Sequence, residues 1–131
     1  LKGKNCKVFY APFDVHFYKK DLKTPDVMQP DLLIACDLEN NVNENGRYMG
    51  TPTLCIEILS KSTRSKDMVD KLNTYMLSGV REFWIVDPFK HSIMVYSFKD
   101  FEIDEYTTCK LGDTVTSYFF EGLEIPINEI F

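Results

Sequence analysis

Hydrophobic and polar positions divide the first half of the chain into short apolar runs separated by polar segments. Residues 8–18 alternate and are rich in aromatic side chains, which predicts a strand or a bent pair of strands around Pro12. Residues 31–36 (DLLIAC) and 53–59 (TLCIEIL) are almost wholly apolar, whereas residues 37–52 between them are rich in Asn, Gly and Glu. This pattern predicts two buried strands joined by a long loop.

The helical period is found in residues 65–78, where apolar side chains recur three or four positions apart and Gly79 follows as a C-terminal cap. Two further apolar runs, 82–86 and 92–98, predict a hairpin turning at residues 87–90. Alternation over 101–108 and near 114–118 predicts two more strands. The order of elements predicts an α/β fold with a mixed central β-sheet and a flanking helix.

The chain has 131 residues and a hydrophobic content of 44%, which is the size of one domain over residues 1–131. Its formal charge of −5 argues against a protein that coats nucleic acid non-specifically. A carboxylate site that binds a cation is compatible with this charge. The sequence shows no apolar run long enough to span a bilayer and no secretory signal pattern. We expect no membrane association.

The four cysteines, Cys6, Cys36, Cys55 and Cys109, have no C-x-x-C spacing, which argues against a zinc knuckle. We expect buried free thiols rather than disulfides, and from them a reducing, cytoplasmic compartment. Two histidines, His16 and His91, lack ligand spacing, and we expect them at the surface or in turns.

Two acidic residues interrupt the apolar strands. Asp31 opens one of them directly after Pro30, and Glu57 lies inside the other. Burying a carboxylate is costly unless a cation neutralises it. If the two strands are neighbours, Asp31 and Glu57 can bind one Mg²⁺ or Mn²⁺ ion, which prefers oxygen ligands.

The helix offers a further cation. Lys71 shares one stripe with Asp67 and Tyr75, because the three are spaced four residues apart, and it lies near the edge of the apolar face. From there its ammonium group could reach the strand ends and stabilise a charged transition state.

The ordered motifs 29–33 (QPDLL), 57–60 (EILS), 62–63, Asp67 with Lys71 and Tyr75, and 79–88 (GVREFWIVDP) resemble the Uma2-like family of the PD-(D/E)XK nuclease superfamily. The resemblance covers most of the chain and implies a restriction-endonuclease-like core. In this family, Asp31 would match the Asp of the PD element and Glu57 the acid that follows. Leu59 stands where the general motif has Lys, and Lys71 matches the lysine that the Uma2-like branch supplies from its helix; Lys61 is a poorer candidate.

The resemblance implies a divalent-metal-dependent endonuclease with DNA as its substrate. The alternative is an inactive nuclease fold that binds DNA or protein. Family members usually carry a helical N-terminal region with another Glu, which nothing before Val8 matches, so we expect an N-terminally truncated domain. We also expect a homodimer, because exposed aromatic residues and edge strands need cover.

Each candidate also has a purely structural explanation. Asp31 could be a strand-start residue capped by local amides, Glu57 could form an ion pair with Lys71 without metal, and Lys71 could simply be solvated. Tyr75 is expected in the core with its hydroxyl at the site edge, and Asp67 as a first-turn charge favoured by the helix dipole. As possible surroundings of the site we retain Tyr75, Asp67 and Gln29. The basic residues Lys61, Arg64 and Lys66 either begin a solvated helix or guide a phosphate backbone.

Overall fold

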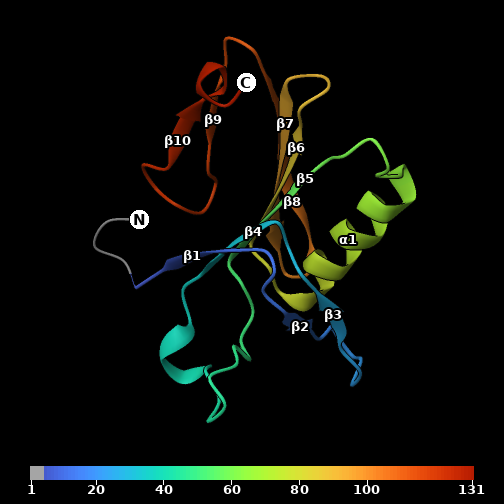
Figure 1. Cartoon of the computed structure of the whole chain (residues 1–131), viewed down its shortest axis with the longest axis vertical. Coiled ribbons are helices and arrows are strands. Elements are labelled where there is room, and N and C mark those ends of the chain that lie inside the picture. Colours follow the sequence, from blue (N-terminus) through green and yellow to red (C-terminus); the bar gives the residue numbers. More distant parts are fainter. Residues whose placement is uncertain (1–4) are drawn as a thin grey trace.

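A six-stranded sheet in the order β1-β4-β5-β6-β7-β8 forms the centre of the computed structural model, which describes residues 5–131 (Figure 1). Its neighbouring strands are antiparallel except β5 and β6, which are parallel. A mixed sheet with one flanking helix confirms the predicted fold class. The six strands are Lys7–Tyr10 (β1), Leu32–Ala35 (β4), Leu54–Ile58 (β5), Glu82–Asp87 (β6), Ser92–Lys99 (β7) and Glu102–Lys110 (β8).

Helix α1 (Ser65–Ser78) connects the two parallel strands, as a crossover between parallel strands requires. It has the bounds that the apolar period predicts. The helix ends because Gly79 takes the left-handed conformation, with φ of 93°, and donates its amide to the carbonyl of Tyr75. This crossover fixes α1 across the strand that carries Glu57.

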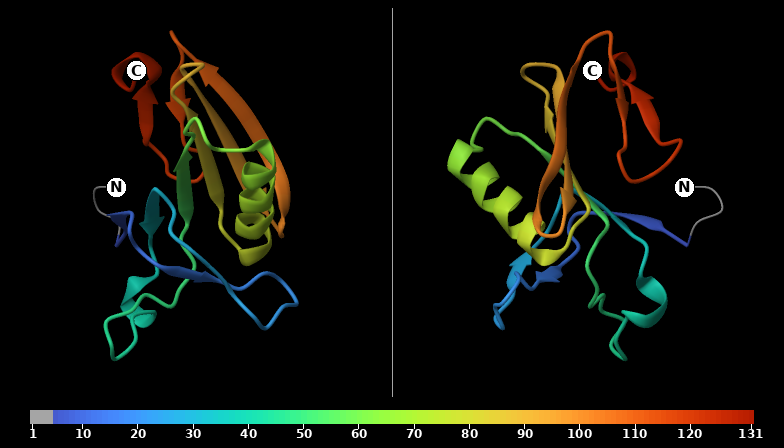
Figure 2. Two further views of the ribbon diagram at one scale, coloured as in Figure 1. Left: turned by 45° about the vertical axis from the view of Figure 1, so that its right-hand side comes forward. Right: turned by 180° about the vertical axis from the view of Figure 1, so that it is seen from behind.

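The sheet has an apolar layer on each face, because successive side chains of a strand point to opposite sides. On one face, Leu33, Cys55 and Phe83 pack with Tyr75 of α1. On the other face, Trp84 and its neighbours pack against the C-terminal segment. That segment contains β9 (Thr114–Thr116), β10 (Glu124–Pro126) and the short helix η2 (Ile127–Glu129). Figure 2 shows α1 and the β9–β10 pair on opposite sides of the sheet.

Several small elements lie around this centre. The predicted bend at Pro12 is confirmed, because a cis Ala11–Pro12 bond separates β1 from β2 (Val15–Phe17). Strand β2 pairs with β3 (Asp26–Met28), which the sequence did not predict, and β10 was also missed. The long loop after β4 is confirmed and contains one helical turn, η1 (Leu38–Asn40).

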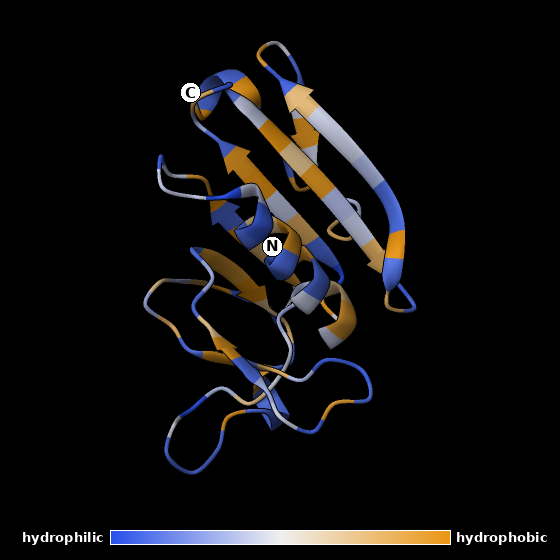
Figure 3. Ribbon diagram, turned by 90° about the vertical axis from the view of Figure 1, so that its right-hand side faces the viewer, coloured by the Kyte–Doolittle hydropathy of each residue, from blue (hydrophilic) through white to orange (hydrophobic). Residues whose placement is uncertain are grey.

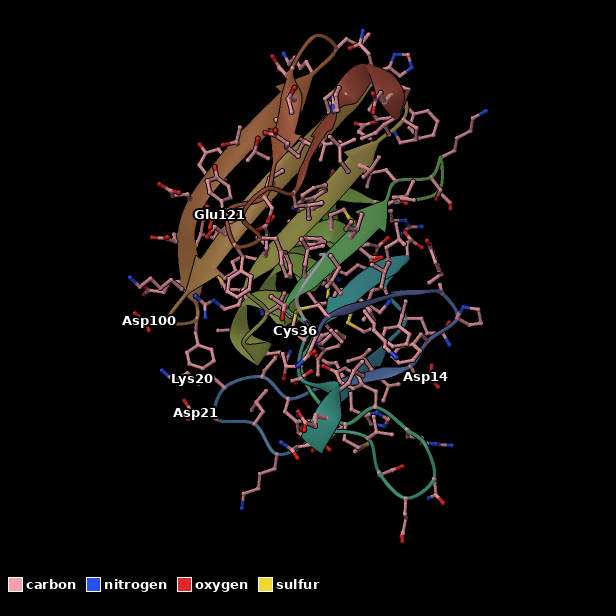
Figure 4. All side chains as sticks on the ribbon, turned by 90° about the vertical axis from the view of Figure 1, so that its left-hand side faces the viewer. Asp14, Lys20, Asp21, Cys36, Asp100 and Glu121 are labelled. Atoms are coloured by element: carbon pink, nitrogen blue, oxygen red, sulfur yellow. A yellow bond between two sulfur atoms is a disulfide. The ribbon has the colours of Figure 1, made fainter. Side chains whose placement is uncertain are left out.

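The prediction of four free thiols is wrong for two of them. Cys6 and Cys36 form a disulfide, whereas Cys55 and Cys109 are free and buried as expected. The disulfide forms because the antiparallel register sets Lys7 opposite Ala35, which brings the adjoining cysteines together; Cys36 is marked in Figure 4. Only the two free thiols, Cys55 and Cys109, therefore remain in favour of a reducing compartment.

Strand β8 is the long outer edge of the sheet, and every residue in it except Cys109 is exposed. In Figure 3 it is mostly pale or blue, whereas the inner strands carry the hydrophobic colour. None of the helices in residues 5–131 is long and apolar enough to cross a membrane.

Of the two histidines, one lies at the surface as expected and the other does not. His91 is exposed in the β6–β7 turn, as predicted. The prediction is wrong for His16, which lies half-buried in β2, because the pairing of β2 with β3 covers it.

Candidate active site

Glu57 lies in the interior of the protein, with 2% of its side chain exposed. It belongs to β5, which runs between β4 and β6, and it points to the α1 side of the sheet together with Cys55. Burial at this position follows from the apolar run around it, since a strand with neighbours on both edges and layers on both faces is largely shielded from solvent.

Two donors on α1 contact the Glu57 carboxylate. The Lys71 Nζ atom lies 3.2 Å from each carboxylate oxygen, and the Tyr75 hydroxyl donates to Oε2 at 3.1 Å. Lys71 and Tyr75 meet the same carboxylate because positions four apart lie on one side of a helix. The Lys71 side chain is 32% exposed, so its ammonium group lies between the buried carboxylate and solvent.

Burial dominates the protonation of this cluster. Desolvation raises the pKa of Glu57, Lys71 lowers it, and the nearby Asp31 carboxylate raises it again. Desolvation, with Cys55 and Glu57 as further causes, raises the pKa of the Tyr75 hydroxyl far above its usual value. Tyr75 therefore stays protonated and acts as a hydrogen-bond donor to Glu57.

Asp31 is half-buried just before β4, and the structure brings it to the end of β5. Its Oδ2 atom accepts a hydrogen bond of 2.7 Å from the backbone amide of Ile58, the residue after Glu57. The two carboxylates therefore lie close enough for one to raise the pKa of the other. The three residues that the sequence singled out for chemistry, Asp31, Glu57 and Lys71, thus share one region of the structure.

Two carboxylates on neighbouring strands are a donor set that suits Mg²⁺ or Mn²⁺, because such ions bind through one or two carboxylates and keep several waters. No group of three or more His, Cys, Asp or Glu side chains is gathered as a metal site in the described part of the chain. The residues therefore fit an open site with two protein ligands better than a closed cage.

Two hollows adjoin Lys71. One of about 410 Å³ is lined by Ser62, Thr63, Met68 and Lys71, among others. Another of about 520 Å³ lies between α1 and β3, with Asp26 and Thr74 on its walls. Both hollows are lined by Lys71, and neither is lined by Glu57 or Asp31.

The remaining candidates have other contacts. Asp67 lies in the first turn of α1, where its Oδ2 accepts the amide of Arg64 at 3.2 Å. The Gln29 amide donates to Asp14 Oδ1 at 2.7 Å. Asp14 lies at the periphery of the molecule in Figure 4. Within residues 5–131, neither Asp67 nor Gln29 hydrogen-bonds to Asp31, Glu57 or Lys71, whereas Tyr75 donates directly to Glu57.

The three basic residues after Glu57 are all exposed. Lys61 lies in the loop after β5, and Arg64 and Lys66 flank the start of α1. Among residues 5–131 the ion pairs are Lys19–Asp26 and Lys71–Glu57, so these three cations have no acidic partner there.

Two features of the structure were missed in the sequence. Asp26 of β3 binds Lys19 at 3.1 Å and Thr74 at 3.3 Å on the wall of the larger hollow. Glu82 is completely buried on the opposite face of the sheet from Glu57. It opens the apolar run 82–86, and the reasoning that identified Glu57, a carboxylate beside an apolar strand, could have found it.

Comparisons with known proteins indicate a nuclease-like protein. The family model Uma2, described as a putative restriction endonuclease, matches residues 1–128. A crystal structure of a putative nuclease belonging to DUF820 from Anabaena variabilis ATCC 29413 matches with a TM-score of 0.75 and 19% identity. That match covers 98% of this chain and 69% of the other. No curated protein matches the sequence.

Proposed function

The chain belongs to the Uma2 family of putative restriction endonucleases, and from this premise we propose that it is a divalent-metal-dependent endonuclease that hydrolyses DNA phosphodiester bonds. Asp31 and Glu57 bind the metal, and Lys71 acts on the reacting phosphate or on the attacking water. Tyr75 positions Glu57.

The contact between Lys71 and Glu57 is the observation that supports the proposal most. A buried carboxylate is costly, and its retention beside an ammonium group and a second carboxylate indicates a use beyond packing. Burial raises the pKa of Glu57 and so penalises its charged form, and a cationic partner is needed to keep the carboxylate negative. A divalent cation is such a partner.

A bound Mg²⁺ or Mn²⁺ would polarise the phosphate and lower the pKa of a water molecule. The protein's own residues supply orientation and charge. Tyr75 holds one oxygen of Glu57, the Ile58 amide holds one oxygen of Asp31, and both carboxylates are thereby fixed. The Lys71 ammonium group lies at the border of the cleft and can contact a phosphate oxygen that develops negative charge.

Cleavage of plasmid and linear DNA in Mg²⁺ tests this function. The wild-type protein should cleave, and Glu57→Gln and Lys71→Ala should each reduce the rate by about 100-fold or more, the usual scale for losing such an electrostatic group. Glu121→Gln is a matched control, since Glu121 is an exposed acid on the C-terminal segment (Figure 4). Cleavage that persists in both site variants, with circular dichroism spectra unchanged, would refute the assignment.

A second candidate function is a non-catalytic module for DNA or protein binding. It is favoured by the fact that Glu57 and Asp31 already have partners from the protein itself, Lys71 with Tyr75 and the Ile58 amide. Such a site can persist for stability alone. This protein would then show no metal-dependent change in melting temperature.

The proposal includes a homodimer and a cytoplasmic location. The exposed edge strand β8, with Tyr106 68% exposed at its centre, supports self-association. The free thiols of Cys55 and Cys109 support a reducing compartment, and the Cys6–Cys36 disulfide opposes it. Sedimentation velocity tests the first point, since a monomer at micromolar concentration would exclude a stable dimer.

A further inference from the structure

A third hollow, of about 320 Å³, lies where β5 and β6 end, near the candidate active site. Its walls come from the loop after β5, with Leu59, Lys61 and Thr63, and from the β6–β7 turn, with Phe89 and Lys90. Figure 1 and Figure 2 show these two connections at the same end of the sheet. The function proposed above makes no use of Phe89 or Lys90.

Phe89 is a large aromatic side chain kept at the surface, with 56% of it exposed. The turn that carries it is fixed, because the Asp87 Oδ1 atom accepts hydrogen bonds of 3.0 Å from the amides of both Phe89 and Lys90. The ring is therefore presented on a short, hydrogen-bonded turn rather than on a mobile loop. A rigid exposed ring is what base stacking needs.

Two lysines line the same hollow as this ring. Lys61 and Lys90 are exposed, and neither belongs to an ion pair within residues 5–131. Asp87 is an acid on the same wall, but its carboxylate is engaged by the two turn amides. An aromatic ring and two cations in one hollow match the chemistry of a nucleotide, which offers a base to stack and a phosphate to neutralise.

The hollow adjoins the hollow beside Lys71. Thr63 lines both this hollow and the hollow that contains Lys71. Leu59, on its wall, follows Glu57 by two residues, and its amide is held by the Val86 carbonyl at 2.9 Å. A nucleic acid strand with a phosphate at Lys71 would pass Thr63 to reach this hollow.

We propose that the hollow binds an unpaired nucleotide of the nucleic acid substrate, with its base stacked on Phe89 and a phosphate held by Lys61 and Lys90. The nature of the ligand rests on the proposed function. A base within a duplex already stacks on both sides, so an aromatic ring can stack only on a base that has left the helix or lacks a partner. The site therefore selects single-stranded or frayed DNA over intact duplex.

Binding of a fluorescein-labelled oligothymidylate, followed by anisotropy in EDTA and low salt, tests the proposal without cleavage. Phe89→Ala should weaken binding by about 5- to 100-fold, the effect of losing one stacked base, and Phe89→Trp should retain it. Tyr18→Ala is the matched control, because Tyr18 is 48% exposed after β2 and should leave affinity unchanged. Lys61→Ala and Lys90→Ala should each reduce the slope of log K against log salt by about 0.7.

The proposal is overturned if the wild-type protein does not bind the oligonucleotide, if Phe89→Ala binds as well as wild type, or if it weakens binding to a blunt duplex equally. This outcome is separable from failure of the endonuclease function. If Glu57→Gln loses metal-dependent cleavage while Phe89→Ala binds as well as wild type, only the nucleotide site is refuted. If binding depends on Phe89 but the protein cleaves no DNA, only the endonuclease function is refuted.

Discussion

The Nζ atom of Lys71 lies 3.2 Å from both carboxylate oxygens of Glu57, and the carboxylate is buried while the lysine reaches the surface. The pair joins the central strand β5 to the helix that follows it. Its energetic contribution is measurable, because each partner can be removed separately.

Lys71→Met should destabilise the protein by about 1–3 kcal/mol, because it leaves Glu57 buried without its cation; the partial exposure of Lys71 keeps the loss below that of a fully buried pair. Urea unfolding in EDTA measures the change in free energy of unfolding. The double variant Glu57→Gln with Lys71→Met should recover most of the loss. Additive effects of the two substitutions would show that the two groups do not interact.

The stability of the protein should depend on pH through Glu57. Burial raises the pKa of Glu57 in the folded state above the value of 4.5 expected for the unfolded chain. Because the folded state then binds the proton more tightly, the stabilising effect of protonated Glu57 is complete below the unfolded pKa. It is lost as pH rises through the folded pKa. Wild type should therefore lose stability relative to Glu57→Gln on going upward from about pH 4.

Unfolding by urea at a series of pH values, with EDTA present, measures this difference. Glu121→Gln serves as the control, since Glu121 is exposed. The expected sign is a free energy of unfolding that falls with pH in wild type but not in Glu57→Gln. Parallel curves for the two proteins would contradict the raised pKa.

Mn²⁺ or Mg²⁺ should raise the melting temperature of the wild-type protein. Binding to the folded state alone at about 100 times the dissociation constant adds about 2.7 kcal/mol of stability. Asp31→Asn and Glu57→Gln should each abolish the shift, and Glu121→Gln should retain it. Differential scanning fluorimetry gives the comparison directly; equal shifts in all four proteins would place the bound metal elsewhere.

Reduction of the Cys6–Cys36 disulfide should lower stability, since it links residues that are 30 positions apart. A loop of that size corresponds to about 3.7 kcal/mol in the chain-entropy account. Thiol titration of the unfolded protein should give two reactive groups, Cys55 and Cys109, before reduction and four after it. Cys36→Ser should reproduce the loss, and four thiols without reductant would exclude the bond.

Glu82→Ala should loosen the C-terminal segment. The buried Glu82 carboxylate accepts hydrogen bonds from the Trp84 indole, from the Ser117 hydroxyl at 2.9 Å and from the Phe119 amide at 2.8 Å. Removing it strands three donors and should cost about 3 kcal/mol or more. Hydrogen exchange should accelerate at Phe119 more than in α1, whereas Glu82→Gln should be milder. Uniform acceleration would mean that Glu82 does not hold this segment specifically.

Much of the fold could be predicted because its main elements carry local signals. Helix α1 was predicted with its bounds, since its apolar period and the glycine that ends it lie within one stretch of sequence. The three-residue strands β3 and β10 were missed because each is too short to show a period and is defined only by its pairing with another three-residue strand. The Cys6–Cys36 bond was missed for the same reason, since it depends on the register of β1 with β4.

The proximity of Glu57, Lys71 and Tyr75 could be anticipated from the sequence, whereas the hydrogen bond of Asp31 could not. Glu57 stood out because a carboxylate inside an apolar strand needs compensation, and Lys71 because it lay on the same helical stripe as Tyr75. The hydrogen bond from the Ile58 amide to Asp31 follows from the pairing of two strands that are 27 positions apart, which no local pattern encodes. Phe89 gave no signal at all, because a single exposed aromatic residue in a turn is common in sequences.

The three groups that meet at Glu57, Lys71 and Tyr75 come from one strand and the helix directly after it, with at most 18 positions between them. Closing so short a loop loses little chain entropy, so the cluster can assemble early, before the outer strands pair. Asp31 and Phe89 join from outside that stretch. The backbone amides of β5 and α1 around the charged pair should therefore be among the last to exchange in native-state hydrogen exchange. The loops that line the neighbouring hollows can open without disturbing the pair.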